Sequence, residues 1–304
     1  VATRAGHEPD GGERPLTLGE AYLGMRLPAR QAKRTNDVGR PRVETAYVGG
    51  GTPSVLPIAL LERLFREVRK RFKPAEGAEV TCEVNPESGA RPEFYARLMR
   101  AGVNRFSLGV QSFDDRRLAA LGRPHSAMQA RTAFVAARSA GARNVSIDLM
   151  HDLPGQRRRD WLEELRQAVE LGPEHLSCYG LTVEPQTRLE GLVESGALTL
   201  PDEDEAARMY LAGGEFLEER GWRQYEVSSF ARLGRESRHN LATWRCEDYL
   251  GLGAGAVSTV TVAGKKLRWK NPLDVREWSA RLDAWEASGT PPGAEELDIR
   301  TQAR

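Results

Sequence analysis

The chain alternates between two hydrophobic patterns. Short β-branched and apolar runs, as in residues 43–48, 79–84 and 105–110, are followed by longer segments such as 57–72, in which apolar residues recur every three to four positions. The short runs have the composition of strands, and the longer period is that of an amphipathic helix. Repeated alternation of the two predicts right-handed βαβ units and a parallel sheet.

The pattern predicts elements along most of the chain. Strands are expected at residues 43–48, 79–84, 105–110, 144–150, 175–181 and 224–228. Helices are expected at residues 16–33 with an interruption at Pro28, and at 57–72, 92–101, 114–121, 126–140, 159–171, 202–220 and 274–287. Glycine directly follows several of these helices, which is a common way for a helix to end.

Polar residues gather where the expected strands end. They are Gly49–Thr52, Glu83 with Asn85, Gln111 and Asp148, each after a different strand. An open sheet would concentrate such residues at one switch point, whereas a (β/α) barrel places them at the end of strand after strand. We therefore predict an α/β fold with a full or partial barrel.

Composition excludes several classes of protein. The 304 residues are 40% hydrophobic and 29% charged with a net charge of +1, which gives no electrostatic case for nucleic acid. No apolar run approaches the roughly 20 residues of a transmembrane helix. Cys82, Cys178 and Cys246 are far apart, so their spacing indicates neither a disulfide framework nor a metal knuckle. A reducing cytoplasm is the expected location.

Three consecutive glycines, Gly49–Gly51, stand between an expected strand and an expected helix and are followed by Thr52 and Pro53. Glycines let a ligand approach the backbone closely, and free N–H groups near a helix start favour anionic or carboxylate groups. The spacing matches neither common nucleotide-binding signature. A ligand site and a simple tight loop both fit this segment.

Four polar residues near strand ends are candidate ligand contacts, each with a structural alternative. Glu83 suits ligand hydroxyls such as those of ribose, or a salt bridge to a neighbouring arginine. Gln111 suits an amide contact or a polar position in the core. Asp148 suits a ligand or a helix N-cap, and Arg123 suits a carboxylate or a solvated loop.

His239 is the fifth candidate, and we expect it in a loop near Trp244. A histidine beside an aromatic residue suits an axial haem ligand, although a lone histidine is usually structural. The glycine-rich run Gly251–Gly255 that follows suits either close approach of a flat ligand or a crowded turn.

Several motifs occur in a characteristic order. They are YVGGGTPS, EVNPES, NRFSLGVQSF, LGRPH, IDLMHDLPGQ, HLSCYGLTVEP, QYEVSSFA, HNxxxW and YLGLGAGA. This set resembles the radical S-adenosylmethionine proteins related to oxygen-independent coproporphyrinogen III oxidase. The YGLTVEP and HN segments are more similar to the HemW-type haem chaperone branch. The resemblance extends from about residue 40 to residue 275.

The resemblance implies a partial (β/α) barrel of radical S-adenosylmethionine type with a C-terminal α+β extension. The implied domains are an irregular or helical N-terminal remnant at 1–40, the barrel core at 41–222 and a truncated extension at 223–304. The implied function is haem-chaperone-like, in haem or porphyrin trafficking or biosynthesis. The alternatives are oxidative decarboxylation of coproporphyrinogen III and a degenerate binding protein without a cluster. Implied partners are haem or porphyrin and a haem-receiving protein.

The resemblance also implies site residues. Gly50, Gly51 and Thr52 match family positions that hold the methionine end of S-adenosylmethionine. Other S-adenosylmethionine contacts match Glu83, Gln111, Arg123 and Asp148, and the family's haem-binding histidine matches His239. No residue is assigned a catalytic role.

The departures from the family pattern set limits. The CxxxCxxC loop that holds a [4Fe-4S] cluster is absent, and the chain begins, with Val1, about where that loop should end. We expect the first strand and the cluster loop to be missing, and therefore neither a cluster nor radical chemistry in this polypeptide. Asp152, Ser237, Thr243 and Val257 replace a usual glycine, cysteine, aromatic residue and histidine.

Overall fold

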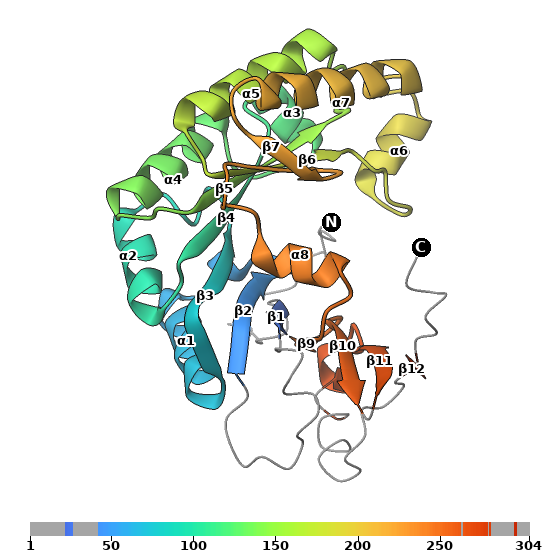
Figure 1. Ribbon diagram of the computed structural model, residues 1–304. Coiled ribbons are helices and arrows are strands. Elements are labelled where there is room, and N and C mark those ends of the chain that lie inside the picture. The colour runs from blue at the N-terminus through green and yellow to red at the C-terminus, as the bar shows by residue number, and fades with distance from the viewer. Residues whose placement is uncertain (1–21, 27–41, 263, 279, 281–294, 297–304) are drawn as a thin grey trace, which may run out of the picture. The chain divides into compact units, whose positions relative to one another are not determined.

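The computed structural model describes residues 22–26, 42–262, 264–278, 280 and 295–296 (Figure 1). The chain divides into two compact units. Among the described residues, the first comprises Val84–Ala96 and Phe106–Glu236, and the second comprises 22–26, 42–83, Arg97–Arg105 and the described residues from Ser237 onward. Each unit is therefore assembled from segments that lie far apart in the sequence. The sequence-based domain boundaries after residues 40 and 222 stay predictions.

The second unit contains the strands that lead into the glycine loop. β2 (Arg42–Gly49) pairs in parallel with β3 (Lys73–Val84), and α1 (Ile58–Arg71) connects them after a short 3₁₀ helix, η2 (Pro53–Val55). The buried face of α1 is formed by Leu61, Phe65 and Val68, which lie one and two turns apart. This is the βαβ unit that the hydrophobic pattern predicts.

The helix expected at residues 16–33 is wrong where the structure describes it. Tyr22–Arg26 forms a strand, β1, which pairs antiparallel with β2 on one side and with β9 (Tyr249–Leu252) on the other. Backbone pairing on both sides overrides the local helical pattern, which sequence reasoning cannot foresee. The remainder of that predicted helix lies outside the described residues.

The C-terminal part of the second unit has the α+β character that the resemblance implies. It contains α8 (Arg238–Trp244) and the antiparallel strands β9, β10 (Val257–Val262), β11 (Lys265–Lys270) and β12 (Glu295–Glu296). A Cβ on Gly251 would lie 2.3 Å from the Val257 carbonyl oxygen, so this glycine permits close approach of two backbones. The expected helix at 274–287 is seen over residues 275–278, and most of its remainder lies outside the described residues.

The first unit continues the strand–helix alternation. β4 (Arg105–Gln111), β5 (Val145–His151) and β6 (His175–Gly180) are parallel, and β8 (Ser229–Ala231) and β7 (Arg223–Glu226) follow antiparallel at one edge. Its helices are α3 (Asp115–Ala120), α4 (Ala127–Ser139), α5 (Arg158–Leu171), α6 (Arg188–Glu194) and α7 (Glu203–Glu218), and α2 (Pro92–Ala101) spans the unit boundary. Figure 1 shows α5 and α7 together on one side of β5 and β6. The predicted α/β fold is confirmed.

The two faces of β4, β5 and β6 differ in chemistry. Phe106, Leu108 and Ile147 lie among the fully buried apolar side chains. Serine and histidine residues alternate with these apolar residues along the strands. Ser146 and His175 have no exposed surface at all. Successive side chains point to opposite faces of a strand, so a buried polar row runs across one face of the sheet. Such a row must satisfy its own hydrogen bonds.

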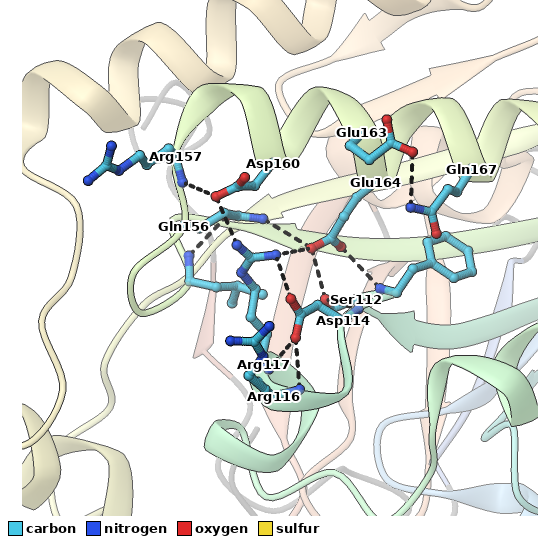
Figure 2. A network of polar contacts seen from close by, with 12 residues as sticks. Ser112, Asp114, Arg116, Arg117, Gln156, Arg157, Asp160, Glu163, Glu164 and Gln167 are labelled. Carbon is cyan, nitrogen blue, oxygen red and sulfur yellow. Dashed lines mark hydrogen bonds and ion pairs between the residues drawn. The ribbon is translucent and has the colours of Figure 1, made fainter.

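A buried carboxylate ties the loops of the first unit together (Figure 2). Glu164 of α5 accepts hydrogen bonds from Ser112 Oγ at 2.9 Å, the Phe113 backbone N–H at 3.2 Å, Arg117 Nη1 at 3.2 Å and Gln156 Nε2 at 3.4 Å. Burial raises the pKa of the Glu164 carboxyl, and these hydrogen bonds and the Arg117 charge oppose the rise. Glu164 therefore fixes the loop that begins directly after Gln111.

We expect Glu164→Ala to lower the free energy of unfolding by about 3 kcal/mol, because Arg117 and three further donors lose their shared acceptor. The neighbouring Glu163 is exposed, so Glu163→Ala is a matched control that should change stability by less than about 0.5 kcal/mol. Urea unfolding of both variants measures the difference. Equal stability of the two variants would contradict the role of Glu164.

Candidate functional site

The glycine loop is fastened to a carboxylate within the second unit. Tyr47 and Gly49 belong to the end of β2, and Glu83 lies near the end of the parallel strand β3. Glu83 accepts a hydrogen bond from the Tyr47 hydroxyl at 2.6 Å and another from the Gly50 backbone N–H at 3.0 Å. Each carboxylate oxygen thus has a donor, one from a side chain and one from the loop itself. The glycine loop and Glu83 form one structure, as the matched family positions imply.

Gly49 makes this arrangement possible. A Cβ at this position would lie 2.5 Å from both Glu83 Cδ and Tyr47 Cε1, which real Cβ atoms essentially never do. The Tyr47–Glu83 pair therefore crosses directly over the Gly49 backbone. Gly50 adopts a φ of 81°, in the region that favours glycine. The first two glycines are thus required for different reasons, one for space and one for conformation.

His239 lies in a helix rather than in the loop that we expect from the sequence. It is the second residue of α8, whose N-cap Ser237 accepts a hydrogen bond from the Asn240 N–H. The Glu79 carboxylate accepts the backbone N–H groups of Arg238 and His239 at 3.1 and 3.0 Å. A carboxylate at a helix N-terminus stabilises the helix because it meets unsatisfied donors and the positive end of the dipole.

The His239 ring is held on two sides. Its Nδ1 lies 2.8 Å from Thr45 Oγ1, and its ring stacks on Tyr47 with centroids 5.2 Å apart and an interplanar angle of 20°. Thr45 and Tyr47 are two apart in β2 and so share one face of the strand. His239 is 6% exposed. A continuous set of contacts therefore leads from His239 through Tyr47 and Glu83 to Gly50.

Gln111 ends β4 in an unusual conformation. Its φ is 68°, in the left-handed region, where a side chain other than glycine is strained. A Cβ on Gly109 would lie 3.1 Å from Gln111 Nε2 and 3.4 Å from Asn85 Oδ1, so both amide groups lie close to this glycine. Strained conformations of this kind gather at functional sites. They support the candidate role of Gln111 rather than a position in a packed core.

Asp148 lies inside β5, so the alternative of a helix N-cap is wrong. The helix that follows, α5, begins at Arg158. The Asp148 carboxylate accepts hydrogen bonds from Ser107 Oγ at 3.1 and 3.0 Å and from Ser146 Oγ at 3.2 Å. Asp148 is therefore an oriented carboxylate on the polar face of the sheet.

Arg123 follows α3 and is half-buried rather than fully solvated. Burial lowers the pKa of the Arg123 guanidinium, and the negative charge of Glu87 opposes this effect. Nearby, His125 Nε2 lies 2.9 Å from the Val110 carbonyl oxygen, and Nδ1 lies 3.7 Å from Glu87. Arg123 thus belongs to a small charged cluster, together with the histidine that contacts the end of β4.

The described cysteines do not form a cluster site. Cys82 and Cys178 are buried, and burial raises the pKa of both thiols, which disfavours the thiolate that ligates iron. Among the residues described, no group of three or more histidine, cysteine, aspartate or glutamate side chains is arranged to hold a metal ion. The donor set therefore does not fit a [4Fe-4S] cluster.

The candidate residues fall into two groups. Gly50, Gly51, Thr52, Glu83 and His239 belong to the second unit, and Gln111, Arg123 and Asp148 belong to the first. Their convergence on one cavity stays a prediction. Sequence reasoning missed Tyr47, Glu79 and Thr45 as supporting residues. The available signal was Thr45 and Tyr47 at alternate positions of the strand that enters the glycine loop.

Comparisons with known proteins agree with the fold. The family model described as "Radical SAM superfamily" matches residues 21–168. The solved structure titled "Coproporphyrinogen III oxidase (HemN) from Escherichia coli is a Radical SAM enzyme" has a TM-score of 0.69 and 22% identity, and the match covers 86% of this chain and 61% of that one. At this identity the likeness shows the fold alone. The partial radical S-adenosylmethionine barrel is confirmed.

Several curated relatives are named "Heme chaperone HemW". The Synechocystis sp. protein is 36% identical over 285 residues, which are 93% of this chain and 68% of that protein. The Escherichia coli protein is 43% identical over 219 residues, 72% of this chain and 57% of that protein. The family model and these relatives together identify a radical S-adenosylmethionine protein. Within that superfamily, the chain belongs to the HemW-type family. It spans about half to two thirds of the length of these relatives.

No helix among the described residues has both the length and the apolar composition that a membrane crossing requires.

Gly49→Ala tests the crossing of Tyr47 and Glu83. We expect a loss of about 1–3 kcal/mol in the free energy of unfolding, because the added methyl group displaces both side chains. A Cβ on Gly191 in α6 would meet nothing within 4 Å outside its own helix, so Gly191→Ala is a control that should be neutral or stabilising. Thermal or urea unfolding gives the comparison. A Gly49→Ala variant as stable as Gly191→Ala would be inconsistent with this geometry.

Asp152 occupies a position where the family pattern has glycine, and its φ of 63° explains that preference. Its Oδ2 lies 2.9 Å from His151 Nδ1. Asp152→Gly loses this contact but relieves the backbone, whereas Asp152→Ala loses the contact and keeps the strain. We expect Asp152→Ala to be less stable than Asp152→Gly by about 1 kcal/mol in urea unfolding. The reverse order would show that the backbone conformation is not the constraint.

Proposed function

We propose that this chain binds S-adenosylmethionine and takes part in haem trafficking, as the names of its HemW relatives suggest. The observation that carries the first half is the Glu83 carboxylate, which the Tyr47 hydroxyl and the Gly50 N–H hold beside the glycine loop. The names of the relatives support the second half.

The residues suit the parts of S-adenosylmethionine. Gly50, Gly51 and Thr52 offer backbone groups for the methionine end, and Arg123 offers a cation for its carboxylate. Carboxylates that are already oriented, as in Glu83 and Asp148, suit the ribose hydroxyls, which need acceptors. When bound, S-adenosylmethionine would supply a sulfonium and an adenosyl group. The described cysteines do not fit a [4Fe-4S] cluster.

His239 is the candidate haem ligand. A histidine that ligates iron through Nε2 is usually fixed by a hydrogen bond at Nδ1, and Thr45 lies at that distance. Trp244 at the end of α8 is 42% exposed and offers an aromatic face for a porphyrin. Because His239 itself is 6% exposed, haem binding would require the side chains around it to move apart.

Glu83→Ala tests cofactor binding. We expect affinity for S-adenosylmethionine to fall at least about tenfold, because a charged acceptor that orders the loop is lost. Glu76 is an exposed glutamate on the same strand, so Glu76→Ala should bind like the unmodified chain. Isothermal titration of S-adenosylmethionine into each protein measures the change. Equal affinity of the two variants would remove Glu83 from the site.

His239→Ala tests the haem ligand. We expect weaker haem binding and a shifted Soret band, because an axial imidazole is lost. His151 is a matched control, since it is also 6% exposed, and His151→Ala should leave the spectrum unchanged. Absorbance titration with haem gives both readouts. An identical Soret band for His239→Ala and the unmodified chain would assign His239 a structural role only.

A further inference from the structure

A chain of hydrogen bonds leads from Asp148 across the first unit to Tyr225. Ser146 Oγ lies 3.2 Å from Asp148 Oδ1 and 2.8 Å from His175 Nδ1. His175 Nε2 lies 2.6 Å from the Tyr225 hydroxyl. These four residues come from β5, β6 and β7, and β8 lies between β6 and β7 in the sheet.

The sheet register places these groups on one face. Ser146 is directly opposite His175 in the parallel pairing of β5 and β6, and Asp148 is two positions farther along β5. Ser107 of β4 is opposite Ser146 on the other side, and its hydroxyl also donates to Asp148. Ser146 and His175 are completely buried, so water cannot compete for the hydrogen bond between them.

An ionised Asp148 and a neutral His175 would together fix the direction of every bond. An ionised carboxylate only accepts, so the Ser146 hydroxyl donates to Asp148 and its oxygen is an acceptor toward His175. His175 must then carry its proton on Nδ1. In the neutral imidazole, Nε2 is an acceptor, and the Tyr225 hydroxyl donates to it. Each group in the series then donates toward the next, from Tyr225 through His175 and Ser146 to Asp148.

We propose that His175 and Tyr225 are positioning residues for S-adenosylmethionine. They fix the Ser146 hydroxyl, and that hydroxyl orients the Asp148 carboxylate that binds the ribose. The proposal gives neither residue a direct contact with the cofactor, and neither was singled out by the sequence pattern. The proposal rests on the proposed function, because it assigns Asp148 to the cofactor. Metal sites use a comparable arrangement, in which a hydrogen bond from one ring nitrogen fixes the tautomer and the orientation of the histidine that ligates the metal.

The tautomer is the first test, and it is independent of any ligand. We expect the long-range ¹H–¹⁵N spectrum of the unmodified chain to show His175 protonated at Nδ1 and unprotonated at Nε2. The His175→Asn variant assigns the signal by its disappearance. An Nε2-protonated His175 would reverse the direction of the bonds and overturn the proposal.

Titration with S-adenosylmethionine is the second test. Tyr225→Phe removes the donor to Nε2 and should weaken binding about threefold to tenfold. Tyr210→Phe makes the same chemical change in a tyrosine whose hydroxyl accepts from Gln224, outside the chain of bonds, and should bind normally. His175→Leu should weaken binding at least as much as Tyr225→Phe. His175→Asn should restore most of the affinity, because an amide N–H replaces Nδ1–H.

The outcomes separate this proposal from the one that it rests on. If the unmodified chain binds and the Tyr225→Phe and Tyr210→Phe variants bind equally well, the positioning role is wrong while the proposed function stands. If the unmodified chain does not bind S-adenosylmethionine, the proposed function fails, and with it the cofactor role of His175 and Tyr225. Tyr225 is not buried, so we expect Tyr225→Phe to fold. This variant therefore still tests the proposal if His175→Leu does not fold.

Discussion

The hydrogen-bonded carboxylate of Glu83 is the constraint on which the second unit depends. A half-buried carboxylate needs a donor for each oxygen, since its unmet hydration would otherwise cost several kcal/mol. The Tyr47 hydroxyl and the Gly50 N–H meet that need, but only because Gly49 has no side chain between them. The sequence of three glycines therefore has a steric origin in the neighbouring strand as well as a role in the loop. A loop held in this way presents its remaining backbone groups in a fixed arrangement, which favours ligand binding because little ordering entropy remains to be lost.

The first unit applies the same rule to two further carboxylates. Asp148 and Glu164 are acceptors only, and each determines how the groups around it must point. Around Glu164 the donors come from two loops and α3, so the carboxylate holds the loops at the ends of β4 and β5. Around Asp148 the donors come from serines on β4 and β5. One carboxylate thus shapes the loops, and the other is presented on the sheet face. Both are needed if Gln111 and Asp148 are to keep a defined geometry.

The sequence predicts the repeated parts of this fold and misses the parts that depend on pairing. The strands that carry Gly49, Gln111 and Asp148 have strong local patterns, and the structure places all of them close to the expected positions. β1 was wrongly predicted as a helix because its strand character comes from pairing with β2 and β9. The helix at His239 was missed because its start depends on Glu79, 160 residues earlier. Tyr47 and His175 were missed for the same reason, since their roles depend on residues far away in the sequence: Glu83 and His239 for Tyr47, and Ser146 and Tyr225 for His175. Local pattern determines elements, whereas register and long-range donors determine the site.

The contact between His239 and Tyr47 links the two proposed ligands of this family member. The Tyr47 ring stacks on His239, and the Tyr47 hydroxyl donates a hydrogen bond to Glu83. A displacement of His239 can therefore shift the Glu83 carboxylate through the Tyr47 side chain alone. If S-adenosylmethionine binds at Glu83 as proposed, we expect a ligand that moves His239 to change the affinity for it. Linkage then requires an equal reverse effect of S-adenosylmethionine on that ligand. It follows that a change in cofactor affinity alone cannot identify His239 as a haem ligand, because loss of the stack would produce it as well. Only a signal that originates at the iron, such as the Soret band, separates ligation from support.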